Sequence, residues 1–111
     1  MPKKFYYTAK NYYGATFRET YTRESRRIRI DYTPAGDPFF RHAGRRYKLD
    51  DFMRINCMSW EPTEIKAADG ETVYICGHEA EVYYKPLFIE IDDAGETVRL
   101  YRYEGTETDY N

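Results

Sequence analysis

Residues 85–104 read KPLFIEIDDAGETVRLYRYE, and this segment predicts a β-hairpin. Apolar and polar residues alternate from Leu87 to Ile91, which is the period of a strand with one buried face. Residues 92–95 have turn chemistry, because Gly95 can adopt a positive φ without a Cβ clash. The apolar pattern resumes at Val98 and Leu100 on the return strand. We expect the other strands to be laid against this ribbon.

Two further hairpins are predicted from their turns. Residues 39–49 contain a turn at 42–45 whose glycine suits a short hairpin loop. Residues 64–76 contain an Asp-Gly pair within 68–71, which is the strongest short hairpin signal in the chain.

Single strands and one helix complete the expected fold. Alternating residues predict strands at 5–10, 15–23 and 26–32. Asp50 is a suitable N-cap for a short helix near 51–58. The fold class is therefore mainly β (α+β): a small antiparallel sheet or half-open barrel built from hairpins, with one short helix.

Length and composition bound the class of protein. The 111 residues predict a single domain spanning 1–111, with a polar and frayed tail at 105–111. No run of about 18 apolar residues exists, and the first residues lack the apolar core of a secretory signal. The two cysteines, Cys57 and Cys76, favour reduced thiols. We therefore expect a cytoplasmic protein that does not enter a membrane.

Tyrosine content and charge order are both unusual. The chain has 13 tyrosines, and a core cannot absorb so many hydroxyl groups, so many must lie at the surface. Residues 1–48 contain 12 Lys and Arg against 4 Asp and Glu, a net charge of +8, whereas residues 49–111 have a net charge of −10. This asymmetry favours a charged partner. The alternative is that the two halves interleave as neighbouring strands and neutralise each other.

Catalytic and metal-binding patterns are absent from the sequence. The two cysteines and two histidines, His42 and His78, do not have the close spacing of zinc ligands, and no third residue orients a thiol nucleophile. Adjacent acids at 50–51 and 92–93 cannot flank a substrate, and no glycine-rich phosphate loop occurs. We therefore expect no enzyme activity, no metal and no cofactor.

The first functional hypothesis is a non-catalytic inhibitor or adaptor. Compact, acidic, tyrosine-rich chains without catalytic residues are typical of small inhibitors made by phages and mobile elements. An acidic face with tyrosine anchors would dock on a basic protein partner, including one that itself binds nucleic acid. The residues predicted to form this face are Tyr83, Tyr84, Glu90, Asp92, Asp93, Glu96, Tyr101 and Tyr103.

The alternative hypothesis is a module that binds single-stranded nucleic acid. Arginine side chains hold phosphates and aromatic rings stack on bases, and the basic half of the chain contains both. The negative charge of the whole chain weakens long-range attraction to such a polyanion. The residues predicted for this surface are Arg23, Arg26, Arg27, Arg29, Arg41, Arg45 and Arg46.

Overall fold

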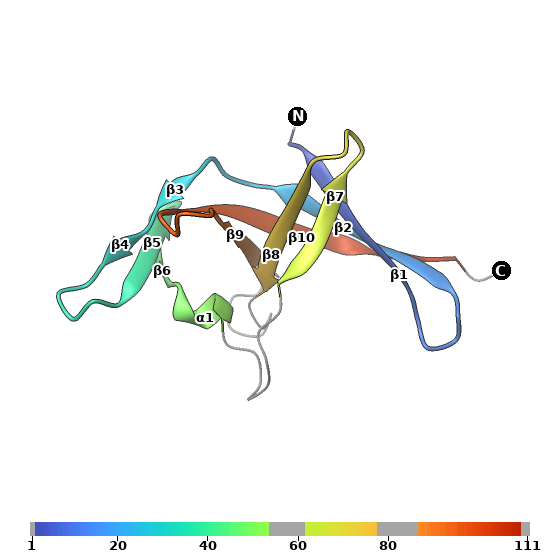
Figure 1. Ribbon diagram of the computed structural model, residues 1–111, viewed down its shortest axis with the longest axis horizontal. Coiled ribbons are helices and arrows are strands. Elements are labelled where there is room, and N and C mark those ends of the chain that lie inside the picture. Colours follow the sequence, from blue (N-terminus) through green and yellow to red (C-terminus); the bar gives the residue numbers. More distant parts are fainter. Residues whose placement is uncertain (1, 54–61, 78–86, 110–111) are drawn as a thin grey trace.

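A closed six-stranded antiparallel barrel forms the centre of the molecule. The computed structural model describes residues 2–53, 62–77 and 87–109. The ring runs β2-β1-β7-β8-β9-β10 and closes by pairing of β10 with β2, and β3 is a further strand attached to β10. Strands β4, β5 and β6 form a separate three-stranded sheet beside the barrel (Figure 1). The mainly β fold class predicted from the sequence is confirmed.

The elements have the following bounds in chain order: β1 Lys4–Lys10, β2 Thr16–Arg23, β3 Ile28–Arg29, β4 Asp31–Tyr32, β5 Pro38–His42, β6 Arg45–Lys48, α1 Asp50–Met53, β7 Thr63–Ala67, β8 Thr72–Gly77, β9 Leu87–Ile91 and β10 Thr97–Thr108.

The β9–β10 hairpin has the predicted register and turn. Ile89 lies opposite Leu100, Ile91 lies opposite Val98, and Gly95 has a φ of 69°. β10 then continues well beyond β9. Its first residues pair with β3 and its last with β2, so this one strand joins three others.

Two hydrophobic cores lie on opposite faces of the same barrel wall. The interior core contains the buried side chains of Phe5, Tyr21, Ile65, Ala67, Val73, Ile75 and Tyr101. The outer core lies between the barrel wall, the small sheet and α1, and contains Ile30, Phe40, Tyr47, Leu49, Phe52, Cys76, Ile89, Val98 and Leu100. Because successive strand residues point to opposite faces, strands β8, β9 and β10 contribute to both cores.

The predicted strand at 26–32 is wrong in one respect. It divides into β3 and β4, which belong to different sheets, and Ile30 lies between them. The backbone N–H of Ile30 donates to the Glu96 carbonyl at 2.9 Å, and its side chain is buried in the outer core. This anchor lets the chain leave the barrel, so Tyr32 is exposed and not on the buried face with Ile28 and Ile30.

The expected frayed tail at 105–111 also differs from the structure. Residues 105–108 belong to β10, and Gly105 to Thr108 pair with Thr20 to Phe17 of β2. The polar side chains of this segment predict no buried face, but backbone pairing with β2 orders it as a strand. Of the predicted helix near 51–58, α1 forms the start, and residues 54–58 lie outside the described residues.

The β5–β6 hairpin has an unusual two-residue turn. Ala43 has a φ of 50° and Gly44 a φ of 75°, so both central residues adopt the left-handed conformation of a type I′ turn. Within the described residues, Ala43 is the one non-glycine with a positive φ. Its Cβ makes this conformation unfavourable, whereas asparagine tolerates it.

Ala43→Asn should therefore stabilise the protein by about 0.5–1 kcal/mol, because it creates the Asn-Gly pair that type I′ turns prefer. The free energy of unfolding in urea measures this effect. Ala35→Asn is the matched control, since Ala35 is exposed in a loop and has no positive φ. An equal effect of both substitutions would contradict the turn assignment.

Candidate functional site

A network of charged and hydroxyl groups occupies the barrel end beside the β7–β8 turn. Arg23 Nη2 donates to Glu71 Oε2 at 2.5 Å, and Arg23 Nε donates to the Tyr101 hydroxyl at 3.1 Å. The Tyr101 hydroxyl donates to Glu90 Oε1 at 2.7 Å, and Arg99 Nε donates to the same oxygen at 2.9 Å. Burial of its ring raises the pKa of Tyr101 to about 12, and the Glu90 carboxylate adds to the effect. The hydroxyl therefore stays protonated and acts as a donor.

This network removes three predicted residues from the surface. Tyr101 is fully buried, and the side chain of Glu90 is 13% exposed, so neither is available to a docking partner. Arg23 is 18% exposed and is paired with Glu71, so it is not a free cation for nucleic acid. The structure therefore places these three side chains toward the barrel interior and not on the surface expected from the sequence.

The other described residues of the predicted acidic face differ in their exposure and contacts. Asp92 accepts hydrogen bonds from the backbone N–H groups of Glu96 and Thr97, and it serves the β9–β10 turn. The Tyr103 ring is half-buried, and its hydroxyl is hydrogen-bonded to Thr106. Asp93 and Glu96 are exposed. Tyr83 and Tyr84 lie outside the described residues.

Several charges of the two halves neutralise each other across strands. Lys3 Nζ contacts Asp69 and Glu71 at 2.6 Å each, and Arg18 contacts Glu107 at 3.1 Å. These ion pairs join the basic first half to the acidic second half, as the interleaving alternative predicts. They account for several basic residues of the barrel, but not for those of the small sheet.

The β5–β6 hairpin presents the strongest group of unneutralised cations. Arg41 and Arg46 lie directly opposite each other, and Phe39 and Lys48 lie on the same outer face. The Arg46 guanidinium lies 3.8 Å from the centroid of the Phe39 ring, and that of Arg41 lies 5.6 Å from it. Neither arginine forms a salt bridge with any residue that the structure describes. Both guanidinium groups are held on one ring and remain exposed.

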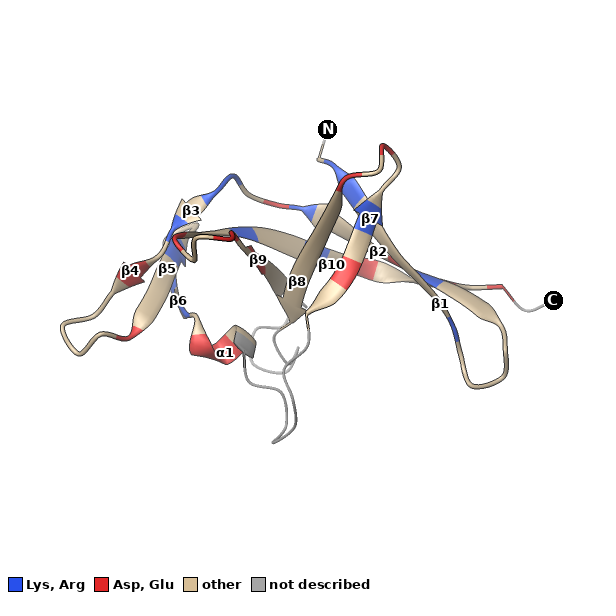
Figure 2. Cartoon of the chain, viewed as in Figure 1, with Lys and Arg blue, Asp and Glu red and all other residues tan. Residues whose placement is uncertain are grey.

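Other predicted arginines lie close to this hairpin. Arg26, Arg27 and Arg29 are exposed on and before β3, and β3 contacts β5 (Figure 2). Arg45 is exposed at the hairpin tip, where its guanidinium lies 5.9 Å from the centroid of the Tyr47 ring. We define the basic surface as Arg26, Arg27, Arg29, Arg41, Arg45 and Arg46.

Acidic residues border the basic surface at three places. The Asp92 carboxylate lies near Arg27, and Glu96 lines a pocket of about 450 Å³ with Arg29. On the small sheet, Asp31 lies opposite Phe39. Arg46 lines a pocket of about 330 Å³ with Asp37, Asp50 and Asp51, so the hairpin is most positive toward its tip, at Arg41.

Sequence reasoning missed the exposure of individual tyrosines. Tyr12 is 95% exposed and Tyr13 is 89% exposed, and their rings contact each other edge to face at the β1–β2 turn. Tyr32 is 62% exposed and lines the same pocket as Arg29. The Asn-Tyr-Tyr-Gly sequence at 11–14 is a turn signal that could have identified the first two, but no periodic pattern identifies Tyr32.

No metal or nucleophile site emerges in the described part of the chain. Across residues 2–53, 62–77 and 87–109, no cluster of three or more His, Cys, Asp or Glu side chains is placed to hold a metal ion. Cys76 is buried, and this burial raises the pKa of its thiol to about 11. Cys57 and His78 lie outside the described residues. In the same ranges, no helix has the length and apolar character needed to cross a membrane.

Comparison with known proteins gives no relative. No protein-family model matches this chain, and no curated protein or solved structure is significantly similar to it.

Glu90→Gln should destabilise the fold by about 1–3 kcal/mol, because it leaves the half-buried Arg99 guanidinium with only the more distant carboxylate of Glu71, at 4.0 Å. Denaturant unfolding measures the loss. Glu104→Gln is the control, because Glu104 is exposed on the neighbouring strand β10 and should change stability by less than about 0.5 kcal/mol. Equal losses would show that the network adds no stability.

Stability should also fall in acid through Glu71. Hydrogen bonds from Arg23 and Lys3 hold the pKa of this carboxyl below its usual value of 4.5 in the folded state. Because the pKa of Glu71 is lowered in the folded state, its ion pairs contribute fully to the free energy of unfolding above pH 4.5. This contribution is lost as the pH falls through the folded-state pKa. Glu71→Gln should therefore flatten the pH dependence of the unfolding free energy below pH 4.5. An unchanged pH profile would exclude this ion pair as a source of acid sensitivity.

Proposed function

We propose that the protein is a non-catalytic module that binds single-stranded nucleic acid through its basic surface. The observation that carries the proposal is the pairing of Arg41 with Arg46. Two like charges stand directly opposite on neighbouring strands, both are stacked on Phe39, and no described carboxylate neutralises either.

A bound phosphate explains this arrangement physically. Like charges directly opposite in a sheet are destabilising, so the hairpin carries a cost that an anion would remove. Arginine presents a planar fork of donors that matches phosphate oxygens. Because Phe39 holds both guanidinium groups, less side-chain entropy is lost when the phosphate binds.

Tyr32 provides a stacking surface close to Arg29, on the face of the small sheet opposite to Arg41 and Arg46. Its ring is exposed and lines a pocket together with Arg29. Proteins that bind single strands without strong sequence preference combine such rings with a positive groove along the backbone. We assign base stacking to Tyr32 and phosphate binding to Arg41 and Arg46.

The exposure of the predicted residues favours this function over the acidic docking face. Six of the seven arginines predicted for nucleic acid are exposed, with Arg23 as the exception. Of the described acidic-face residues, Asp93 and Glu96 are exposed, whereas Tyr101 is buried. A nucleic-acid-binding role also fits the cytoplasmic location expected from the sequence.

The double substitution Arg41→Glu and Arg46→Glu should weaken binding of a labelled single-stranded oligonucleotide at least about tenfold at low salt. It should also reduce the slope of log K against log salt by about 1.4, the value for two phosphate contacts on a single strand. Fluorescence anisotropy in a salt series measures both quantities.

The control for this experiment is Lys4→Glu with Lys66→Glu, which reverses two exposed charges on the barrel. It changes the net charge equally and should leave the salt slope nearly unchanged. Tyr32→Ala should lower affinity without changing the slope, because stacking releases no counterions. Absence of wild-type binding at low salt, or equal effects of the two double variants, would refute the proposal.

A further inference from the structure

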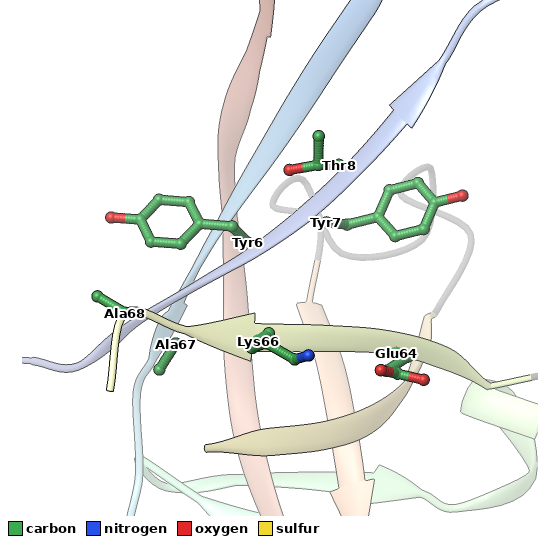
Figure 3. Close-up of a pocket in the computed structure, with 7 residues that line it drawn as sticks. All are labelled: Tyr6, Tyr7, Thr8, Glu64, Lys66, Ala67 and Ala68. Atoms are coloured by element: carbon green, nitrogen blue, oxygen red, sulfur yellow. The ribbon is translucent and has the colours of Figure 1, made fainter. Parts of the chain in front are cut away.

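A wedge opens between β1 and β7 at a short seam of the barrel. β1 pairs with β7 at only two positions, Phe5 with Ala67 and Tyr6 with Lys66, whereas it pairs with β2 along its whole length. Beyond Tyr6 the two strands separate. They line a groove of about 590 Å³, with Tyr6, Tyr7 and Thr8 on one side and Glu64 and Lys66 on the other (Figure 3).

The β1 edge in this wedge carries unpaired backbone groups. Arg23 N–H donates to the Lys3 carbonyl, and Asn11 N–H donates to the Ala15 carbonyl, each at 2.9 Å. Backbone groups alternate between the two sides of an antiparallel strand, so the odd-numbered residues of β1 face β2. Thr8 and Lys10 therefore direct N–H and C=O toward the wedge, where no strand of the described chain pairs with them.

We propose that this edge binds the same edge of a second copy of the chain, forming a symmetric antiparallel dimer. A two-fold axis at Ala9 places Thr8 opposite Lys10 of the second copy, and Lys10 opposite Thr8. This register is the one that joins the free groups of both residues in four hydrogen bonds. It also brings the two Ala9 residues face to face at the closest approach of the strands, where a small side chain fits.

Charge complementarity supports the same register. Continuing the pairing of β1 with β7 places Glu64 level with Thr8, on the outer face of the sheet. The second copy's strand enters between them, so Lys10 of the second copy lies beside Glu64. Both side chains are exposed, and neither forms an ion pair with another described residue of its own chain.

The exposed tyrosines at the β1–β2 turn also gain a role. In this register the turn of one copy reaches the closed end of the other copy's wedge, near Tyr6. Asn11 Oδ1 accepts hydrogen bonds from the N–H groups of Tyr13 and Ala15, so the turn is ordered before association. Tyr12 and Tyr13 then bury rings that are almost fully exposed in a single chain.

Charge exchange at Lys10 and Glu64 tests the proposal. Sedimentation velocity at concentrations up to about 1 mM should show a wild-type dimer, because a micromolar association is populated there. Lys10→Glu alone and Glu64→Lys alone should each weaken dimerisation about tenfold, since each places like charges at two symmetric contacts. The combined variant should restore the wild-type association.

Two further variants distinguish an interface at the β1 edge from a general effect of charge or of lost stability. Lys4→Glu changes an exposed charge on the same strand outside the wedge and should leave dimerisation unchanged. Thr8→Pro removes an N–H that faces the wedge and not β2, so the fold should remain and the dimer should be lost. A wild-type monomer at about 1 mM, or a dimer unaffected by the single charge reversals, would overturn the proposal.

Discussion

Pairing of β10 with β2 is the constraint on which the rest of the structure depends. It closes the ring of six strands, and it aligns Tyr101 with Arg23 across the seam. This alignment joins the Tyr101 hydroxyl to Arg23 on one side and to Glu90 on the other. A hydrogen-bonded network of this kind is stable in a partly buried site because every member has a partner.

Closure of the barrel also brings together the positive and negative charges that are segregated in the sequence. Strands from the basic first half and the acidic second half become neighbours around the ring, and ion pairs such as Arg18 with Glu107 join them. The small sheet stands outside the ring and, among the described residues, pairs with no strand of the acidic second half. Arg41 and Arg46 therefore form no ion pair with a described residue. The topology thus determines which cations are free to bind a ligand.

Local chemistry was sufficient to predict the hairpins. Turn glycines such as Gly70 and Gly95, flanked by alternating residues, fix both the turn and the register that follows it. The division of residues 26–32 was not predictable in this way. It depends on the contact of Ile30 with Glu96, which is distant in the sequence.

The candidate site was predictable only in part, for a related reason. Alternation shows which residues share a face, but not what covers that face. Glu90 and Tyr101 were correctly placed together, yet their face is the barrel interior and not the surface. The opposition of Arg41 and Arg46 follows from the hairpin turn alone. The open edge of β1 does not, because it depends on the separation of β1 from β7.

The shared wall of the two cores has a consequence for sequence change by insertion and deletion. In β10, Leu100 enters the outer core and Tyr101 enters the interior. Insertion of one residue within this strand would exchange the two sets, sending aliphatic groups into the charged network and the tyrosine hydroxyl into an apolar layer. Single-residue length changes should therefore be confined to the turns, such as 93–96, while the wall strands vary by substitution alone.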